Sequence, residues 1–381
     1  MHLVILTDIY TTYMTVKVMR ILSWFLIFIG PFVIQAQPFS AYTNIRQEFY
    51  VFDNGAMHRA EAFSPIDYKI GRNLIAYVDN QQNFKVFKDG EVSMVNDNNT
   101  TSFEVSDNLL VYKNASLLSV IDGNDQILLS RLCDRYALGD SIVMFYDINR
   151  QTFNAYYNGD ITELESFLNI QDDDFSFDKT VKVSDNVGAY INYNGLFKLF
   201  YNNKVETLES QPVREFQVGR NIVAYTDINN IFKINYQGQE FTIDPFPPKS
   251  FKVGDDVVAF ENNDGYFKIF YKGSVYTIGY YQPNYKVADR IVAFEDLNGY
   301  LKVFYEGEQT VIDNYYPEKM ELGYNSLAYI NKASMLRMFS KGKVYDVSSM
   351  SLLEMRLDYD VLQFKVGFNA FRMFYNGEFY N

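Results

Sequence analysis

The chain has few of the residues on which most metal and covalent chemistry depends. Its 381 residues include two His, His2 and His58, and a single Cys, Cys133. A protein zinc site takes several imidazole or thiolate ligands, so that class of site is excluded, as is a disulfide within the chain. Catalysis by a His general base is nearly excluded for the same reason.

Positive charge is also scarce. Lys and Arg number 34 against 47 Asp and Glu, which gives a formal net charge of -13. A basic nucleic-acid-binding surface is therefore not expected, and no Gly-rich phosphate-binding motif is present. Aromatic residues are abundant, with 33 Phe and 32 Tyr against one Trp, and hydrophobic residues make up 48% of the chain. This composition is typical of a folded protein.

One apolar run stands out near the N-terminus. Residues 21–34 form this run, Lys17 and Arg20 precede it, and Ala36 offers a small residue for cleavage. A membrane-spanning helix needs about 20 apolar residues, and this run is shorter and contains Gly and Pro. The pattern is typical of a secretory signal peptide.

We therefore expect residues 1–36 to be a signal peptide and residues 37–381 to be the mature protein, periplasmic or secreted and without a membrane span. Met14 or Met19 would each begin a more ordinary signal, so the true start could lie at either. The alternative is an uncleaved membrane anchor.

Internal repetition decides the fold prediction. Segments that resemble Ile-Val-Ala-Phe-Glu-Asp recur along the chain, and their small central residue, here called the anchor, is separated from the next by 35, 35, 33, 45, 35, 35, 34, 35 and 35 residues. Most anchors are followed 14 residues later by a turn Gly. The ten anchors are Ala41, Ala76, Val111, Met144, Ala189, Ala224, Ala259, Ala293, Ala328 and Gln363.

Each repeat predicts four short strands, A to D. In residues 285–313 the strand-like segments are separated by Asp-Arg, Leu-Asn-Gly and Glu-Gly, and such dipeptides are strong hairpin signals. Pro residues fall between strand D of one repeat and strand A of the next, where no ladder hydrogen bond is lost. Helical periodicity is absent. The chain is therefore expected to be all-β.

The way in which the sheets pack follows from strand C. Residues 266–271, Tyr-Phe-Lys-Ile-Phe-Tyr, are apolar on both faces, so both faces of the sheet must be covered. Radial repetition of similar four-stranded sheets achieves this and is a β-propeller. A linear β-solenoid is the alternative. The first repeat lacks a strand A; we favour ten blades, one of them three-stranded, over a smaller ring with a unit outside it.

The repeat resembles a known class of protein. Asp255-Asp-Val-Val-Ala-Phe260 followed by Asp264-Gly-Tyr-Phe-Lys-Ile-Phe270 resembles the repeats of bacterial exported propellers of the TolB type and of WD-type propellers. The resemblance runs from about Pro38 to Asn381 and implies blades and a role as an interaction platform. It implies no catalytic residue. The Ser-Pro-Asp-Gly turn of the first class and the Trp-Asp dipeptide of the second are missing.

A row of basic residues is the first candidate binding feature. These residues lie nine positions after the anchor on strand C, so a ring would place them at one radius, where they could meet an anionic ligand. Alternatively, their stems pack between blades and their charges pair, with Glu261 opposite Lys268 and Glu295 opposite Lys302. The row consists of Lys85, Lys198, Lys233, Lys268, Lys302, Arg337 and Arg372.

The second candidate is the one long insertion, near residues 163–179. It contains Asp172, Asp173 and Asp174, which could bind a partner or contribute oxygen ligands to Ca²⁺. The ordinary Ca²⁺ loop pattern is not met, so a solvated acidic loop is the alternative. No other metal or cofactor is expected.

These observations together favour a binding protein. We expect an exported, non-enzymatic scaffold that binds a protein or an envelope glycan through one face of the ring, and no catalytic residue is assigned. The alternative is a carbohydrate-active enzyme, a glycosidase or lyase, that uses paired carboxylates. The sequence leaves the oligomeric state open.

Overall fold

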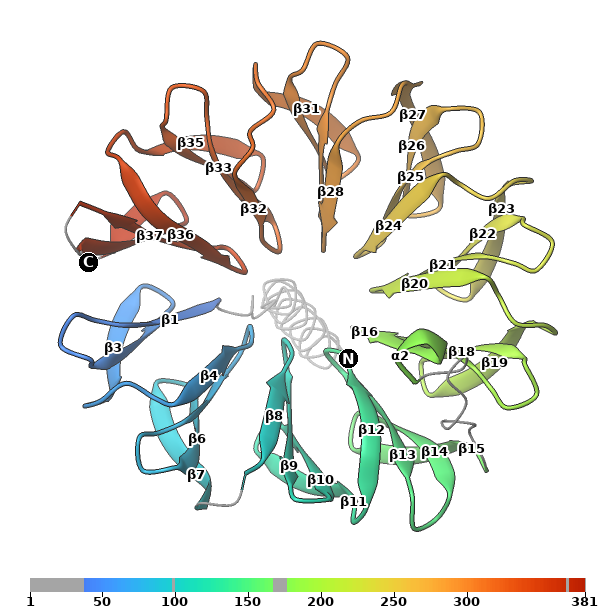
Figure 1. Cartoon of the computed structure of the whole chain (residues 1–381), viewed down its shortest axis with the longest axis horizontal. Helices are drawn as coiled ribbons and strands as arrows, with labels where there is room; N and C mark the ends of the chain where they lie inside the picture. Colours follow the sequence, from blue (N-terminus) through green and yellow to red (C-terminus); the bar gives the residue numbers. More distant parts are fainter. Residues whose placement is uncertain (1–37, 98–99, 167–176, 368–369, 381) are drawn as a thin grey trace, which may run out of the picture. The chain divides into compact units, whose positions relative to one another are not determined.

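The computed structural model describes residues 38–97, 100–166, 177–367 and 370–380, all within one compact unit, Gln37–Asn381. The described strands form ten antiparallel sheets, the blades, arranged around a common axis (Figure 1). Nine blades have four strands and the first has three. The expected all-β, ten-bladed fold is confirmed, and within the described residues the first blade has no strand A, as predicted.

The strands follow the repeat closely. Blades 1 to 3 contain β1 (Phe39–Thr43), β2 (Phe49–Asp53), β3 (Ala56–Glu61); β4 (Asp67–Ile70), β5 (Ile75–Val78), β6 (Asn83–Lys88), β7 (Glu91–Asp97); β8 (Ser102–Val105), β9 (Leu109–Asn114), β10 (Leu117–Asp122) and β11 (Asp125–Ser130). Blades 4 to 6 contain β12 (Cys133–Leu138), β13 (Ile142–Asp147), β14 (Thr152–Tyr157), β15 (Asp160–Glu165); β16 (Val181–Ser184), β17 (Val187–Ile191), β18 (Phe197–Tyr201), β19 (Lys204–Glu209); β20 (Glu215–Gly219), β21 (Ile222–Thr226), β22 (Phe232–Tyr236) and β23 (Gln239–Asp244). Blades 7 to 10 contain β24 (Ser250–Gly254), β25 (Val257–Glu261), β26 (Tyr266–Tyr271), β27 (Ser274–Tyr280); β28 (Tyr285–Ala288), β29 (Ile291–Glu295), β30 (Leu301–Tyr305), β31 (Glu308–Asp313); β32 (Met320–Leu322), β33 (Ser326–Ile330), β34 (Leu336–Ser340), β35 (Lys343–Ser348); β36 (Leu352–Asp358), β37 (Val361–Val366), β38 (Ala370–Tyr375) and β39 (Glu378–Tyr380).

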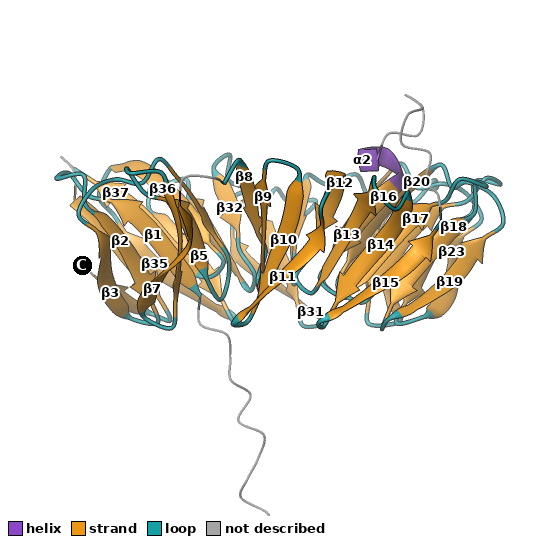
Figure 2. Ribbon diagram, turned by 90° about the horizontal axis from the view of Figure 1, so that it is seen from below, coloured by secondary structure: helices purple, strands orange, loops and turns teal. Residues whose placement is uncertain are grey.

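Helix is nearly absent from the part of the chain that the structure describes. The helix in the described part of the chain is α2 (Phe177–Thr180), which leads into blade 5 (Figure 2). Within the described residues, no helix is both long enough and apolar enough to span a membrane.

The turns form because the sequence supplies the conformations that they need. Between β26 and β27, Lys272 and Gly273 have φ of 47° and 85°, as a two-residue hairpin of the I′ type requires. After strand B, a side-chain oxygen caps the turn: Asp227 Oδ1 accepts from the amides of Asn229 and Ile231 at 2.9 and 2.8 Å. The sequence prediction that Asp and Asn stabilise these turns is confirmed.

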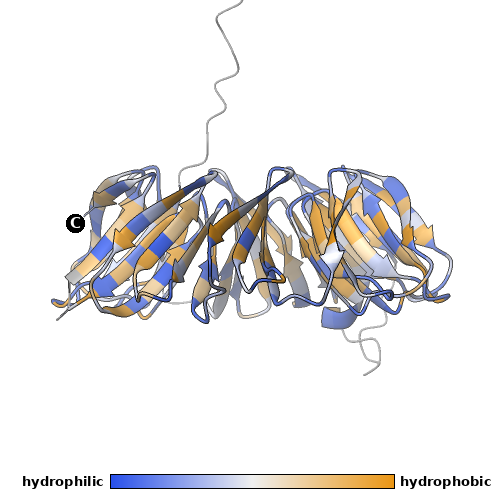
Figure 3. Ribbon diagram, turned by 90° about the horizontal axis from the view of Figure 1, so that it is seen from above, coloured by the Kyte–Doolittle hydropathy of each residue, from blue (hydrophilic) through white to orange (hydrophobic). Residues whose placement is uncertain are grey.

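Both faces of the blades are buried, as strand C predicted. In blade 7, Phe267 and Ile269 pack against Val292 and Phe294 of blade 8. Phe270 points the other way and joins the cluster shared with blade 6. Apolar residues of this sheet therefore pack on both of its sides, and hydrophobic residues recur along the strands around the ring (Figure 3). The core is a series of layers between neighbouring blades.

Near the axis the blades approach so closely that side chains are excluded. A Cβ on Gly219 would lie 2.0 Å from the carbonyl oxygen of Gly254 in the next blade, and one on Gly254 would lie 2.5 Å from the carbonyl oxygen of Asp289. Glycine at the end of strand A is therefore required by the packing of one turn on the next.

Arg356 connects the last blade with the first two. The side chain seven positions before the anchor, on strand A, usually donates a hydrogen bond to a backbone carbonyl in strand A of the next blade. Lys286 Nζ, for example, donates to Met320 O at 3.1 Å. Arg356 occupies this position in blade 10, where the next blade has no strand A. Its guanidinium instead donates to Ala41 O of β1 at 2.6 Å and to the Tyr68 hydroxyl of blade 2 at 3.0 Å. The side chain of Arg356 therefore fills part of the space beside β1, where the described residues contain no strand A.

The loops divide between two faces of the ring. The D-to-A connections contact the B-to-C turns: Tyr316 N donates to Gly299 O at 2.9 Å, and Gly265 lies beside the ring of Tyr280. The C-to-D turns contact the A-to-B turns on the other face, where Gln237 N donates to Asn221 O at 2.8 Å. We call the first face the connection face and the second the turn face.

Candidate functional site

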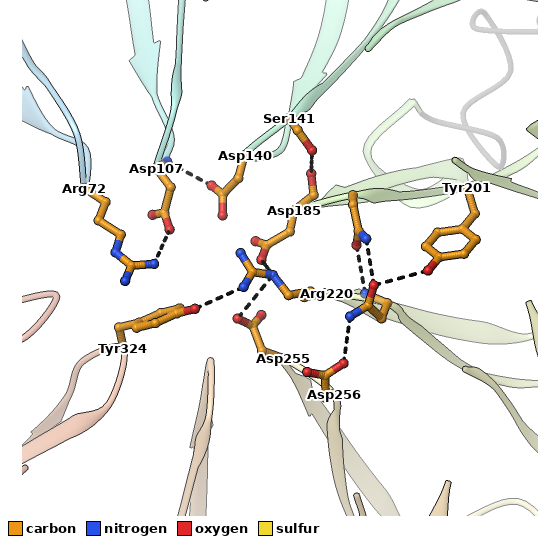
Figure 4. A network of polar contacts seen from close by, with 12 residues as sticks. Arg72, Asp107, Asp140, Ser141, Asp185, Tyr201, Arg220, Asp255, Asp256 and Tyr324 are labelled. Carbon is orange, nitrogen blue, oxygen red and sulfur yellow. Dashed lines mark hydrogen bonds and ion pairs between the residues drawn. The ribbon is translucent and has the colours of Figure 1, made fainter. Parts of the chain in front are cut away.

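Nine A-to-B turns converge on the axis at the turn face. The first residue of each turn lies four positions before the anchor. Figure 4 shows seven of their side chains gathered around the axis, those of Arg72, Asp107, Asp140, Asp185, Arg220, Asp255 and Tyr324. This position repeats in phase but is not constant in type: five are Asp, two are Arg and two are Tyr. We call them the axial cluster: Arg72, Asp107, Asp140, Asp185, Arg220, Asp255, Asp289, Tyr324 and Tyr359.

Arg220 is the central cation of this cluster. Its guanidinium pairs with the carboxylate of Asp185 and lies 3.9 Å from that of Asp255. It also donates to the hydroxyl of Tyr324, three blades away, at 3.1 Å (Figure 4). Such a bond between distant blades means that the side chains meet across the axis.

Tyr324 is held from two further directions. The guanidinium carbon of Arg72 lies 4.1 Å from the centre of its ring, and that of Arg290 lies 4.9 Å away. Arg72 in turn pairs with Asp107 at 3.8 Å. Cation–π contacts of this kind are attractive when partly desolvated. The axial cluster therefore ties blades 2, 3, 5, 6, 7, 8 and 9 together at the turn face.

The next residue of each turn forms an outer chain of contacts. Asn221 is its best-connected member. Its side-chain Nδ2 donates to Asp256 Oδ1 at 2.8 Å, and its side-chain Oδ1 accepts a hydrogen bond from Asn186 Nδ2 at 2.7 Å. Tyr201 donates to Asn221 Oδ1 at 3.4 Å. Figure 4 shows these links on one side of the cluster, between Tyr201 and Asp256. They fix the turns that present the axial side chains.

Negative charge is in excess in the cluster, which raises the pKa of several carboxyls. Burial raises the pKa of Asp255 to about 7, helped by the charge of Asp185 and opposed by Arg220 and Arg290. Burial and the neighbouring carboxylates likewise raise the pKa of Asp289 well above its usual value. Groups with such perturbed pKa values are common at functional sites.

Asp140 and Asp107 follow the same trend. Burial raises the pKa of Asp140, and a hydrogen bond to Asp185 and the charge of that residue add to the effect. Burial also raises the pKa of Asp107, although a hydrogen bond from Tyr359 opposes it. The cluster therefore holds protons at pH values where an exposed Asp would have lost them.

This predicts a loss of stability as pH rises. The pKa of Asp255 is about 7 when folded and close to 3.8 when unfolded, so between these values the folded state binds more protons. The free energy of unfolding must then fall as pH rises from about 4 to about 7. We expect thermal unfolding measured across this range to show the fall and Asp255→Asn to reduce it. A melting temperature that rises throughout this range would contradict the prediction.

The cluster does not form a metal site. Among the described residues, no group of three or more His, Cys, Asp or Glu side chains is placed to hold a metal ion. Asp172, Asp173 and Asp174 lie outside the described residues, so their role in partner or Ca²⁺ binding stays a prediction.

The basic row lies between blades and is largely engaged in ion pairs. Lys85 Nζ contacts Glu61, at the end of strand D of the preceding blade, at 2.6 Å, and Asp79 at 2.9 Å. Lys198 and Lys233 bind their own preceding-blade Glu at 2.5 and 2.6 Å. The remaining pairs are Lys302 with Asp296 at 3.3 Å, and Arg337 with Asp313 at 3.2 Å and Asp346 at 2.6 Å.

Two members of the row differ from the others. Lys268 and Arg372 make no ion pair with any described residue, and Lys268 lies 5.9 Å from the ring centre of Tyr266. Binding of an anionic ligand by the row stays a prediction, and most of its charge is already neutralised by pairing between blades.

The expected cross-strand register of this row is wrong. Lys268 lies opposite Phe260, and Lys302 lies opposite Phe294. Five residues separate the last facing pair of strands B and C, Glu261 with Phe267 and Glu295 with Leu301, so each strand C residue faces the strand B residue one position earlier than a two-residue turn would give. Glu261 pairs instead with Lys249 of the preceding connection at 2.9 Å.

Exposed aromatic and aliphatic side chains gather on the connection face of blades 6 to 8. They come from the B-to-C turns of these blades and the connections between them, and the rings of Tyr266 and Tyr280 meet at 5.1 Å. Leu297 and Tyr280 are 74% and 69% exposed. We call this set the aromatic arc: Ile228, Phe246, Tyr266, Tyr280, Leu297 and Tyr300.

A known family accounts for the whole of this architecture. The family described as the 10-bladed beta propeller domain matches residues 33–380. The chain belongs to this family. This ten-bladed propeller carries the axial cluster at its turn face and the aromatic arc at its connection face. A search of curated proteins found no match.

Solved propeller structures are similar at low identity. The computationally designed protein Ika8 is 15% identical, with 73% of this chain and 96% of that chain covered and a TM-score of 0.32. Hsv2p of Kluyveromyces lactis is 10% identical, with 63% and 92% covered and a TM-score of 0.31. PorZ of Porphyromonas gingivalis, a bacterial surface component of the type-IX secretion system, is 10% identical, with 89% and 58% covered and a TM-score of 0.25. Likeness at this level carries no functional argument.

The sequence reasoning missed the axial cluster although its signal was present. Every member lies four residues before an anchor, so aligning the repeats would have shown a column that mixes Asp, Arg and Tyr. A repeat position that holds acidic, basic and aromatic residues, beside positions that hold one residue type, indicates that side chains from different repeats contact one another there. The aromatic arc had a weaker signal, because its members come from several columns.

Proposed function

We propose that this ten-bladed propeller is an exported, non-enzymatic scaffold that binds a protein or an envelope glycan through the aromatic arc. The observation that carries the proposal is the exposure of six large apolar side chains on neighbouring turns of one face. Contiguous exposed apolar surface often marks an interaction site. The propeller fold itself is consistent with a binding scaffold.

The arc is built on rigid turns, which favours binding. Phe246 lies between Pro245 and Pro247, and its amide donates to Asp244 Oδ1 at 3.1 Å. Asp296 Oδ1 caps the turn that carries Leu297 by accepting two backbone amides. Side chains that are fixed before binding lose little conformational entropy when a partner is engaged.

The chemistry of the arc suits both partner classes. Tyr and Phe are enriched among the residues that dominate protein interfaces, and their ring faces also attract the C–H faces of sugars. Exposed Asn263, Asp264 and Asn298 beside the rings supply hydrogen-bonding groups for hydroxyls or peptide groups. The strong net negative charge of the chain disfavours an acidic partner.

Replacing Phe246 and Tyr280 together by Ala tests the proposal. Loss of two exposed aromatic anchors should weaken binding about thirtyfold or more, if each contributes as interface anchors usually do. We would measure what the immobilised protein retains from cell-envelope extract and from a polysaccharide panel. Leu128→Ala, at an exposed position of blade 3, is the control. A retained species that the double variant holds as well as the wild type would refute a role for the arc.

A second candidate function is a carbohydrate-active enzyme, and the axial cluster favours it. A carboxyl with a raised pKa next to a second carboxyl, as at Asp140 and Asp185, is the arrangement in which one group can serve as a general acid. Arg220 and Tyr324 occupy the centre of the cluster, which leaves this candidate second. Turnover of a polysaccharide that Asp140→Asn abolishes would support it, and no turnover on a broad panel would dismiss it.

A further inference from the structure

The outermost strand of each blade is an edge strand of its sheet. In each sheet the last strand pairs on one side only among the described residues. Natural proteins usually protect such edges with charged side chains, which prevent edge-to-edge pairing. Nine of the ten outer strands, all but β27, carry at least one acidic residue: Glu61, Glu91, Asp125, Asp160, Glu206, Glu240, Glu308, Asp346 and Glu378.

Strand β27 is the exception. Its seven residues, Ser-Val-Tyr-Thr-Ile-Gly-Tyr, include no charge and are rich in residues that favour extended structure. Val275 and Tyr276 are exposed although both are apolar. The strand is also held in place, because it pairs with β26 along its length and the ring of Tyr276 packs on Phe304 at 5.3 Å. It is a long, ordered edge without a charged side chain, and one bulge, at Ile278, interrupts its pairing with β26.

This edge is compatible with a second copy of itself. If two β27 strands pair antiparallel, no charged side chain faces another across the new ladder. The neighbouring outer strands differ, because β23 carries the exposed Glu240 and β31 the exposed Glu308. Self-pairing of either strand would bring the acidic side chains of the two copies close to one another, which is destabilising.

The two ends of β27 are complementary in charge. Lys272 lies two residues before Ser274, the first residue of the strand, at the turn face. At the other end, Tyr280 lies beside the turn that carries exposed Asp264, since a Cβ on Gly265 would be 3.4 Å from the Tyr280 ring. Antiparallel pairing would place Lys272 of one copy at the end where Asp264 of the other lies. The attraction would fix the direction of pairing.

We propose that two copies of this chain associate edge to edge through β27, antiparallel, so that the four strands of blade 7 in each copy form one continuous sheet. Such an interface is isologous and closes with two-fold symmetry, so it limits the assembly to a dimer. The backbone hydrogen bonds of the new ladder supply affinity, and Val275, Tyr276 and Thr277 supply apolar contact. The aromatic arc and the dimer edge share Tyr280, the last residue of β27, whereas Thr277 belongs to the edge alone.

Thr277→Lys tests the proposal. We would produce the protein from the full chain and measure its mass by light scattering and sedimentation velocity over a wide range of concentration. The wild type should form a reversible dimer. The dissociation constant of the variant dimer should be at least about tenfold higher, because the substitution places a charge in each copy of the paired edge.

The repeats supply a matched control. Thr242 of β23 faces Lys233 in the same way that Thr277 of β27 faces Lys268, so Thr242→Lys makes the same change on a different outer strand. We expect Thr242→Lys to leave the dimer unchanged, and circular dichroism to show both variants folded. A monomeric wild type at every concentration, or a dimer that both variants weaken equally or neither weakens, would overturn the proposal. So would a monomer whose β27 instead pairs with a strand of another protein.

Discussion

Replacing Arg220 by Met should lower the free energy of unfolding by about 3 kcal/mol, towards the lower end of the range for breaking a buried ion pair. The side chain of Asp255 is 4% exposed, and without Arg220 its carboxylate and that of Asp185 face each other with no cation between them. The tyrosine hydroxyl on the opposite side of the axis loses its partner as well. Chemical denaturation of the variant and the wild type measures the difference.

The charge explanation can be separated from loss of packing. If the cost comes from uncompensated carboxylates, adding Asp185→Asn and Asp255→Asn to Arg220→Met should recover a large part of the lost stability. The interaction energy of such a cycle isolates the coupling between these groups. A triple variant no more stable than Arg220→Met would show that Arg220 acts through its aliphatic stem and not through its charge. The variant should also show a steeper fall in stability with rising pH, because Asp255 loses the cation that opposes its raised pKa.

Arg356→Met should destabilise the contact between the first and last blades by about 2–4 kcal/mol, because one change removes several hydrogen bonds from a charged donor. The guanidinium bonds Ala41 O of β1, the Tyr68 hydroxyl and the carboxylate of Asp358, the last at 2.8 Å. Burial alone would raise the pKa of Asp358, and the charge of Arg356 opposes that rise. Hydrogen exchange should therefore become faster in β1 before it does in other blades.

Lys286→Met is the matched control for this prediction. Lys286 occupies the same strand A position and donates to Met320 O, but it does so towards a blade that has its own strand A. Its loss removes one partly exposed hydrogen bond and should cost about 1 kcal/mol or less. If Lys286→Met proves as costly as Arg356→Met, the special role of Arg356 in joining the last blade to the first is wrong.

Phe52 shows what else holds the first blade. It is fully buried with Val361 and Met373 of blade 10, and its ring meets those of Tyr375 and Tyr380 at 6.1 and 5.0 Å. No strand from one end of the chain completes the blade at the other end in the described residues. Side-chain packing and Arg356 therefore join these blades, which explains why the largest local effect is expected there.

Much of the fold was predictable because it depends on short-range signals. Turn dipeptides such as Lys272-Gly273 fix the hairpins locally, and the recurring anchor shows that every blade is built in the same way. The apolar residues on both faces of strand C required a neighbour on each side, which the packing of Phe267 and Phe270 in opposite directions confirms. Each of these features lies within about one repeat, so it can be recognised from the sequence alone.

The sites were not predictable in the same way, because they depend on which repeats meet. Arg220 and Tyr324 are 104 residues apart and come together only because ten blades surround one axis. Their charges and rings act across that axis, and no local pattern encodes the distance. The sequence alone shows that residues 274–280 carry no charge. That β27 lies at the edge of its sheet follows from the order of the strands. The sequence by itself determined the blade and its repetition. Only the tertiary structure decided which side chains are desolvated at the centre and which remain unpaired at the edge, because desolvation and pairing depend on contacts between blades.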